Sequence, residues 1–292
     1  MKKTVSILAA LVFALLLLLF PGDAAGAVRE ALALCAQSVL PSLFPFLIAV
    51  ELLCSLGFSA WLQRLCGPMM GPLFSLRGAC AMPLLAGLLG GYPTGAATAA
   101  ALHEQGLLSR TEAEKLLGFC NNCGPAFILG YTASILGDSS LGWRLWAVHL
   151  LSALVTGVLL CRPGRGKTTP ALSRPLPAPV VSPSLALTGA VKRAVTASLN
   201  ICAWVVLFRV LAALLPLPGW TIGALELVSG VAALPPGRAG FIAAAGLLAW
   251  GGLSVHCQTM TVIGDLPAAA HLRGKLLQSA LSVLLAWLLA PV

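Results

Sequence analysis

The chain has 292 residues, of which 59% are hydrophobic and only 9% are charged, whereas a typical soluble domain carries about 25% charged residues. This composition excludes a soluble globular protein and predicts an all-α, polytopic integral membrane protein with roughly eight to ten membrane segments, some of them half-length. The net charge of +9 does not indicate a nucleic-acid partner, because most of the cations lie in short loops, where they orient a protein in the lipid bilayer.

The N-terminal segment, residues 1–25, begins with Lys2 and Lys3 and continues with an apolar run to Phe20 and a group of small residues. This pattern is typical of a secretory signal peptide with a cleavage site, and equally of a short first transmembrane helix. Because the rest of the chain is also apolar enough for the membrane, we prefer an uncleaved helix.

Residues 26–161 are expected to form the first half of the membrane domain. The stretch 27–57 begins amphipathic and becomes apolar, and its prolines predict a bend. The stretch 61–77 is typical of a loop or an interfacial segment, with Gly-Pro pairs as breakers. Residues 78–90 are apolar but too few to span a bilayer, which predicts a re-entrant arm that returns through residues 96–102.

A more polar stretch, residues 107–117, predicts a short helix at a membrane face. Ser109 suits its N-cap, and Glu112 stands at the third helical position, as in a capping box. We interpret this helix as a solvated surface element without a catalytic role. Residues 143–161 then predict an ordinary membrane span with Trp and Arg at its start.

Residues 162–184 are rich in proline and cations and contain no acid, which predicts an extended cytoplasmic linker. The second half, residues 185–292, begins with a long helix over 185–215. A short apolar arm follows over 239–250, and the last span begins near residue 271, with Arg273 and Lys275 at its near end.

A short sequence echo relates the two halves. Ala86–Gly95 reads AGLLGGYPTG and Ala245–His256 reads AGLLAWGGLSVH, and each has a glutamate upstream in an apolar segment, Glu51 and Glu226. Glycine pairs let a helix stop inside the bilayer, and paired interrupted segments point to a transporter's substrate site. We therefore predict two inverted repeats, each with a re-entrant broken-helix hairpin. The alternative is a chance recurrence in a chain rich in Ala, Gly and Leu.

Polar side chains inside apolar segments are the candidate functional residues, because they are costly in hydrocarbon. Glu226 ranks first, as a coupling carboxylate or a substrate acceptor, with a structural ion pair to Arg209 as the alternative; for Glu51 the same two readings are equally weighted. His256 could relay protons or simply pack. Asn121 and Asn122 are adjacent, and adjacent helical residues face different sides, so at most one of the two should face a ligand. Amide contacts between helices are the alternative. The predicted substrate-binding residues are Gly91, Tyr92, Pro93, Thr94, Asn121, Asn122, Glu226, Ser254, His256 and Gln258.

Catalytic signatures are absent from the sequence, which has no serine elbow, no H-E-x-x-H, no Walker loop and no dinucleotide fingerprint. We therefore expect no enzyme and no cofactor, and movement of a small molecule that is facilitated or coupled to an ion, H⁺ or Na⁺. Cys120 and Cys123 form a C-x-x-C, but no second pair or clustered histidine supports redox chemistry or zinc, so we expect no metal.

Four stretches together resemble a known family: PSLFPFLIAVELL, GGYPTGA at Gly90–Ala96, EAEKLLGFCNNCGPAFILG at Glu112–Gly130, and GGLSVHCQ at Gly251–Gln258. They resemble the sporulation integral membrane proteins of the YlbJ type, which carry nucleoside-recognition "Gate" domains and look like the concentrative nucleoside transporter fold, with inverted repeats that each contain a re-entrant hairpin.

The resemblance implies passage of dipicolinic acid from the mother cell towards the forespore, across the mother-cell or outer forespore membrane. A second copy of the chain and other sporulation membrane proteins are candidate partners. Two other functions remain open at this point: a nucleoside-type transporter, and a membrane scaffold for spore assembly that transports nothing.

Overall fold

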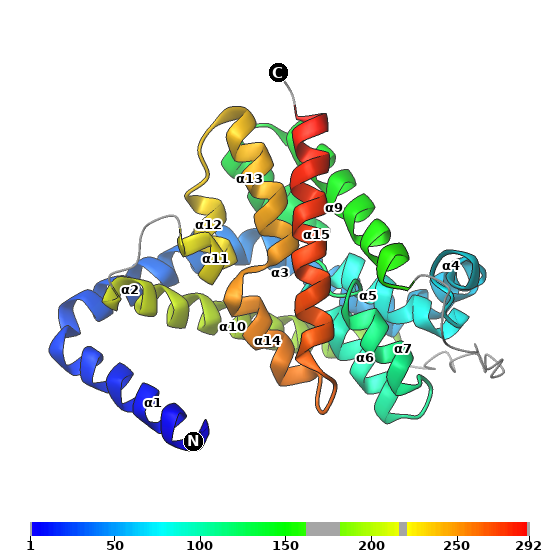
Figure 1. Ribbon diagram of the computed structural model, residues 1–292, viewed down its shortest axis with the longest axis horizontal. Helices are drawn as coiled ribbons and strands as arrows, with labels where there is room; N and C mark the ends of the chain where they lie inside the picture. The colour runs from blue at the N-terminus through cyan, green and yellow to red at the C-terminus, as the bar shows by residue number, and fades with distance from the viewer. Residues whose placement is uncertain (1, 162–181, 216–220, 291–292) are drawn as a thin grey trace.

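The computed structural model describes residues 2–161, 182–215 and 221–290. These residues fold as helices joined by short connections, with no strand among them, which confirms the all-α class (Figure 1). Most of the predicted linker, residues 162–181, lies outside the described residues.

Four helical segments of the described chain are long and apolar enough to cross a membrane. Two further pairs of helices would qualify if each bent pair is one span, which raises the number to six. The other apolar helices are too short to cross, as expected for half-length segments. The four long segments are Ser139–Leu160, Pro183–Leu214, Gly237–Val262 and Ala268–Leu289.

The N-terminal part is a bent helical path. Helix α1 (Lys2–Leu19) meets α2 (Pro21–Leu34) at 97°. A π-helical turn, η1 (Cys35–Val39), then leads into α3 (Leu40–Ser55). A proline frees the carbonyl four residues before it, and a π-turn just ahead of Pro41 is one way to accommodate that loss.

Helix α4 (Phe58–Phe74) replaces the loop or interfacial segment predicted for residues 61–77. The chain stays helical through Pro68 and Pro72, because packing can outweigh local propensity, and Met70 and Phe74 are buried in the core. The chain turns by 107° between α4 and the next apolar segment, which comprises η2 (Gly78–Cys80) and α5 (Ala81–Gly90).

Helices α5 and α6 (Thr94–Glu104) pack against each other as a hairpin, hereafter hairpin 1, with its tip at residues 91–93. This is the re-entrant pair of arms predicted from the shortness of residues 78–90. The positive φ of Gly91, +79°, lets the chain reverse at the tip. Gly87 and Gly95 let both arms approach the carbonyl of Cys120, which would lie within 2.0 Å of a Cβ at either position.

A broken helix follows hairpin 1. Helix α7 (Arg110–Leu117) begins with the predicted capping box, in which Ser109 and Glu112 bond each other's backbone N–H. The helix ends in a non-helical stretch at residues 118–124, and the chain resumes as η3 (Ala126–Thr132) and α8 (Ala133–Leu136). Helix α9 (Ser139–Leu160) completes the half.

The second half repeats this order of elements. Helix α10 (Pro183–Leu214) is followed by two short helices, α11 (Ile222–Leu225) and α12 (Leu227–Ala232), that pack together as hairpin 2. The Cα of Gly223 lies only 2.3 Å from where a Cβ on Gly230 would be, so the chain reverses at Glu226. The broken helix is α13 (Gly237–Trp250) with α14 (Gly252–Val262), and α15 (Ala268–Leu289) is last.

The second hairpin therefore lies elsewhere than the sequence echo predicted. The echo at Ala245–His256 falls in α13 and α14, which follow each other as one broken span of 26 residues, whereas the echo at Ala86–Gly95 falls in hairpin 1. Recurrence of four common residues does not mark equivalent positions, because a reversal is set by its turn, here the Glu226 cap. The structural counterpart of the Gly251 break is the stretch 118–124.

Equivalent elements of the two halves run in opposite directions, as inverted repeats require. In the α9–α15 pair, Ser152 bonds Ser282, while Gly118 lies against both Leu160 and Gly274. Residue numbers therefore rise along one helix as they fall along the other. The same holds for α10 and the α2–α3 path, where Arg193 pairs with Glu51 and Arg209 with Glu30. Figure 1 shows α9 and α15 running side by side.

Candidate functional site

A cavity of about 740 Å³ lies where both hairpin tips, the first helix break and α14 meet. Hairpin 1, hairpin 2, the first break and α14 each contribute to its wall. The other side is made by α3 and α10. Seven of the ten predicted residues line it: Gly91, Tyr92, Pro93, Thr94, Glu226, Ser254 and Gln258.

The walls of the cavity combine flat apolar surfaces with a polar side. Phe46, Phe127 and Trp204 contribute aromatic rings from three different elements. Helix α10 adds polar and charged side chains that are exposed, so the cavity opens on this side. Apolar walls with a few placed polar groups are typical of small-molecule sites. The polar residues of α10 at the cavity are Lys192, Arg193, Thr196 and Asn200.

Two helix N-termini face the cavity. Helix α6 begins at Thr94, and α14 begins at Gly252, two residues before Ser254; both are 11 residues long. The free N–H groups and the helix dipole make such termini favourable for anionic groups. Gly251 and Gly252 have φ of +85° and +78°, a conformation that favours glycine and brings α14 to the tip of hairpin 2.

Glu226 lies at the tip of hairpin 2, where its carboxylate caps α12. One oxygen accepts a hydrogen bond from the N–H of Val228 at 2.8 Å and the other from the N–H of Ser229 at 2.6 Å. The alternative of an ion pair with Arg209 is wrong, because Arg209 pairs with Glu30 at 3.0 Å. Glu226 therefore shapes the cavity wall chiefly by holding the hairpin tip.

The charged groups at the cavity mouth are partly neutralised. Arg193 binds Glu51 at 2.5 Å and also donates to the hydroxyl of Ser55. Among the ion pairs of the described residues none includes Lys192. Lys192 is therefore the charge at the mouth that remains for an anion entering from α10.

Three predicted residues lie behind the cavity wall and do not line it. The amide of Asn121 donates to Thr259 Oγ1 at 2.8 Å, and Asn122 Oδ1 accepts from Gln278 at 2.9 Å. The two asparagines thus join the first break to the second half. These are amide contacts between helices, the alternative to substrate binding given above. His256 Nδ1 lies 3.0 Å from His271 Nε2. All three predicted residues are buried.

Sequence reasoning missed a buried polar cluster on α15. Lys275, placed at the near end of the last span, is fully buried, and so are His271 and Gln278. Its Nζ donates to the carbonyl oxygen of Asn121 at 2.6 Å and to Gln278 Oε1 at 2.5 Å. The signal was present in the spacing, because residues 271, 275 and 278 fall on one helix face.

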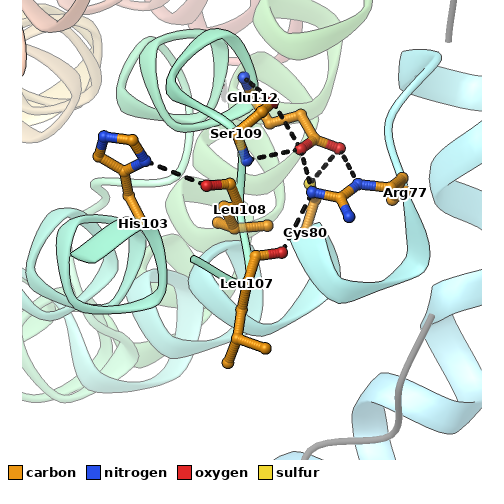
Figure 2. A network of polar contacts seen from close by, with 7 residues as sticks. All are labelled: Arg77, Cys80, His103, Leu107, Leu108, Ser109 and Glu112. Carbon is orange, nitrogen blue, oxygen red and sulfur yellow. Dashed lines mark hydrogen bonds and ion pairs between the residues drawn. The ribbon is translucent and has the colours of Figure 1, made fainter. Parts of the chain in front are cut away.

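A second polar network lies away from the cavity and ties the residue before η2 to α7 and to the segment between α6 and α7. Arg77 makes a bidentate contact with Glu112, one bond at 2.6 Å, and donates to the carbonyl of Leu107 at 3.1 Å (Figure 2). Burial raises the pKa of Glu112, but hydrogen bonds from Arg77 and Ser109 outweigh it and hold the pKa at about 2. The network is structural, since no cavity residue belongs to it.

Two comparisons with known proteins found sequence similarity to parts of this chain. Residues 36–139 match the Gate family, described as nucleoside recognition; this range includes hairpin 1 and the first break. The sporulation integral membrane protein YlbJ of Bacillus subtilis strain 168 is 36% identical over 138 residues, which are 47% of this chain. The chain spans about a third, 34%, of the length of that relative. No solved structure matches the chain.

Proposed function

We propose that this integral membrane protein is a transporter of a small polar or anionic solute, because residues 36–139 match the Gate family and the chain is similar to the sporulation integral membrane protein YlbJ. The observation that carries the proposal is the cavity between the two hairpin tips, the first helix break and α14. In transporters with inverted repeats the substrate site lies at the repeat interface, lined by broken helices. Movement of one half against the other would then open the cavity to each side in turn.

The solute we propose is dipicolinic acid, moved from the mother cell towards the forespore across the mother-cell or outer forespore membrane. Dipicolinate is a planar pyridine ring with two carboxylates. The rings of Phe127 and Trp204 offer flat apolar surfaces to such a molecule. The N-termini of α6 and α14, with the Thr94 and Ser254 hydroxyls, are suited to its carboxylates.

The test is the dipicolinic acid content of spores from a host strain that lacks the protein. The strain is complemented with wild type, Thr94→Val or Gln258→Leu at matched membrane levels. Thr98→Val is the control, because Thr98 lies one turn further along α6, bonds the carbonyl of Thr94 and does not line the cavity. We expect wild type and the control to restore dipicolinate, and both cavity variants to fall several-fold short.

Normal dipicolinate in spores of the deletion strain would overturn the proposed substrate. A nucleoside substrate is the second candidate, favoured by the nucleoside-recognition description of the matched family. It predicts that uridine or adenosine, and not pyridine dicarboxylates, raises the unfolding temperature of the purified protein. A membrane scaffold that transports nothing predicts instead that both cavity variants complement the deletion fully.

A further inference from the structure

Lys275 is a buried cation held by neutral oxygen atoms alone. Its Nζ donates to the carbonyl of Asn121 at 2.6 Å, to Gln278 Oε1 at 2.5 Å and to the hydroxyl oxygen of Tyr92 at 3.4 Å. No ion pair among the described residues includes it. Buried charges are normally paired with an opposite charge, so this arrangement calls for an explanation beyond packing.

The number of acceptors around Nζ matches the number of N–H donors of an ammonium group. An ammonium has three N–H donors and no acceptor, and the three partners are all oxygen acceptors. Tyr92 can accept because its own proton is directed to the carbonyl of Leu248 at 2.9 Å. A neutral amine has only two N–H donors, so loss of the proton leaves one of the three oxygens without its partner.

Two of the three partners of Lys275 belong to the parts that form the cavity, and the third, Gln278, lies on α15 itself. Asn121 lies in the first break, and Tyr92 is the tip of hairpin 1, with its ring centroid 5.2 Å from Nζ. Through Leu248 the same tyrosine reaches the end of α13, just before the second break. Tyr92 also lines the cavity. Loss of one of these bonds therefore acts on an element that touches the solute.

The other titratable groups around Lys275 carry no negative charge that would fix its proton. They are Tyr92 from hairpin 1, Cys120 and Cys123 from the first break, His149 from α9, His256 from α14 and His271 one turn earlier on α15. None of them is a carboxylate. Burial disfavours the ammonium and the three oxygen acceptors favour it, and one of these acceptors, the hydroxyl of Tyr92, belongs to hairpin 1.

We propose that Lys275 is a proton-binding site that couples transport to a proton gradient. The inference rests on the proposed transport function. The ε-amine takes up one proton from the aqueous phase on one side and becomes an ammonium, which holds hairpin 1 through Tyr92 and the first break through Asn121. It releases the same proton to the other side when the cavity opens there. Solute and proton are coupled because both bias the same hairpin.

The test uses purified protein in liposomes with an entrapped pH dye and the membrane potential clamped. Radiolabelled dipicolinate and radiolabelled uridine are offered in separate arms, under a pH gradient or a Na⁺ gradient. For one proton per solute, a gradient of two pH units should drive accumulation of about 100-fold, tenfold per unit. We expect accumulation together with proton movement under the pH gradient, and none under the Na⁺ gradient.

The main variant is Lys275→Arg, because arginine keeps a cation in place and does not release its proton. It should still exchange labelled for unlabelled solute but lose accumulation and proton movement. Arg273→Gln is the matched control, a basic residue two positions away on α15 that is exposed, and it should behave as wild type. Exchange by Lys275→Arg shows that the variant is folded.

Each outcome of these transport measurements supports or removes the proton site, the proposed substrate or both. Uridine movement coupled to protons, with no dipicolinate movement, sustains the proton site and removes the proposed substrate. Solute movement without protons, accumulation driven by Na⁺, or undiminished coupling in Lys275→Arg removes the proton site and leaves the transport proposal standing. Absence of both solute and proton movement in vesicles that contain folded wild-type protein overturns both.

Discussion

The hydroxyl of Tyr92 donates a hydrogen bond to the carbonyl oxygen of Leu248 at 2.9 Å. The two residues are 156 positions apart in sequence, one at the tip of hairpin 1 and the other in the last turn of α13 before the second break. One bond thus connects the re-entrant element of the first half to the broken helix of the second, beside the cavity. A movement of one half relative to the other would therefore strain or break this bond.

Replacement of Tyr92 by phenylalanine removes this bond and keeps the ring at the cavity wall. A buried carbonyl left without its partner costs about 1–3 kcal/mol, so we expect the free energy of unfolding of Tyr92→Phe in detergent to fall by that amount. Solute uptake should fall as well. Unfolding followed by circular dichroism and uptake in liposomes measure the two effects.

Ser279→Ala is the control for Tyr92→Phe. Ser279 Oγ donates to the carbonyl of Gly246 at 3.0 Å, a comparable bond to α13 that does not touch the cavity. We expect a similar loss of stability and no loss of uptake per folded molecule. Equal uptake by Tyr92→Phe and wild type would show that the bond between the halves has no part in transport.

Hairpin 1 depends on two glycines that face the first break. A Cβ on Gly87 would lie 1.7 Å from the carbonyl oxygen of Cys120, and one on Gly95 would lie 2.0 Å from it. Gly87→Ala and Gly95→Ala must push the hairpin away from the break, and overpacking of this kind costs about 1–3 kcal/mol or more. We expect reduced stability and lost uptake, measured as yield of monodisperse protein and by vesicle transport.

Gly26→Ala is the matched change for these glycines, since Gly26 lies in α2 with nothing within 4 Å of the added Cβ. An alanine in an open helical position should be neutral or stabilise by about 0.5–1 kcal/mol. Stability of Gly87→Ala equal to that of Gly26→Ala would contradict the close approach of hairpin 1 to Cys120.

The two oxygens of Glu226 each accept one backbone N–H of α12, so amide and alanine substitutions should differ. Glu226→Gln keeps one acceptor oxygen, and Glu226→Ala keeps none. Loss of an N-cap costs about 0.5–2 kcal/mol, so the alanine variant should lose more stability and uptake than the glutamine variant. Glu30→Gln, which breaks an exposed pair with Arg209, should change stability little. Equal losses for the two Glu226 variants would mean that the cap does not hold the tip.

The sequence was sufficient for the class and for hairpin 1, because these depend on local properties. Apolar composition requires a membrane protein, and a stretch as short as residues 78–90 cannot cross a bilayer. Hairpin 2 was missed because α11 has four residues and α12 has six. Helices of that length show no periodicity, so only the cap formed by Glu226 in the folded chain reveals the turn.

Lys275 was missed for a different reason. Arg273 and Lys275 are two residues apart, so they point to nearly opposite sides of α15, and hydropathy does not tell which of the two faces the core. In the structure Arg273 is exposed and Lys275 is buried. Its partners, the carbonyl of Asn121 and the hydroxyl of Tyr92, come from more than 150 residues away. Only the tertiary fold places them together.

The ion pair between Arg77 and Glu112 predicts how the stability of the folded protein changes at acidic pH. The pKa of Glu112 in the folded protein, about 2, lies below the ordinary value of 4.5 for a free glutamate. A carboxyl group whose pKa is lowered in the folded state stabilises the fold fully above its ordinary pKa. This contribution is lost as the pH falls from about 4.5 towards 2. The shift corresponds to a stabilisation on the order of 3 kcal/mol at neutral pH.

Glu112→Gln should therefore be less stable than wild type at pH 7, and the difference should shrink as the pH falls to 3. Glu114→Gln is the control on the same helix, because Glu114 pairs with the exposed Arg110 and such pairs contribute about 0–1 kcal/mol. Denaturant unfolding in detergent at pH 7, 5 and 3 measures all three proteins. A stability difference between wild type and Glu112→Gln that stays constant over this range would show that the Glu112 proton is not linked to folding.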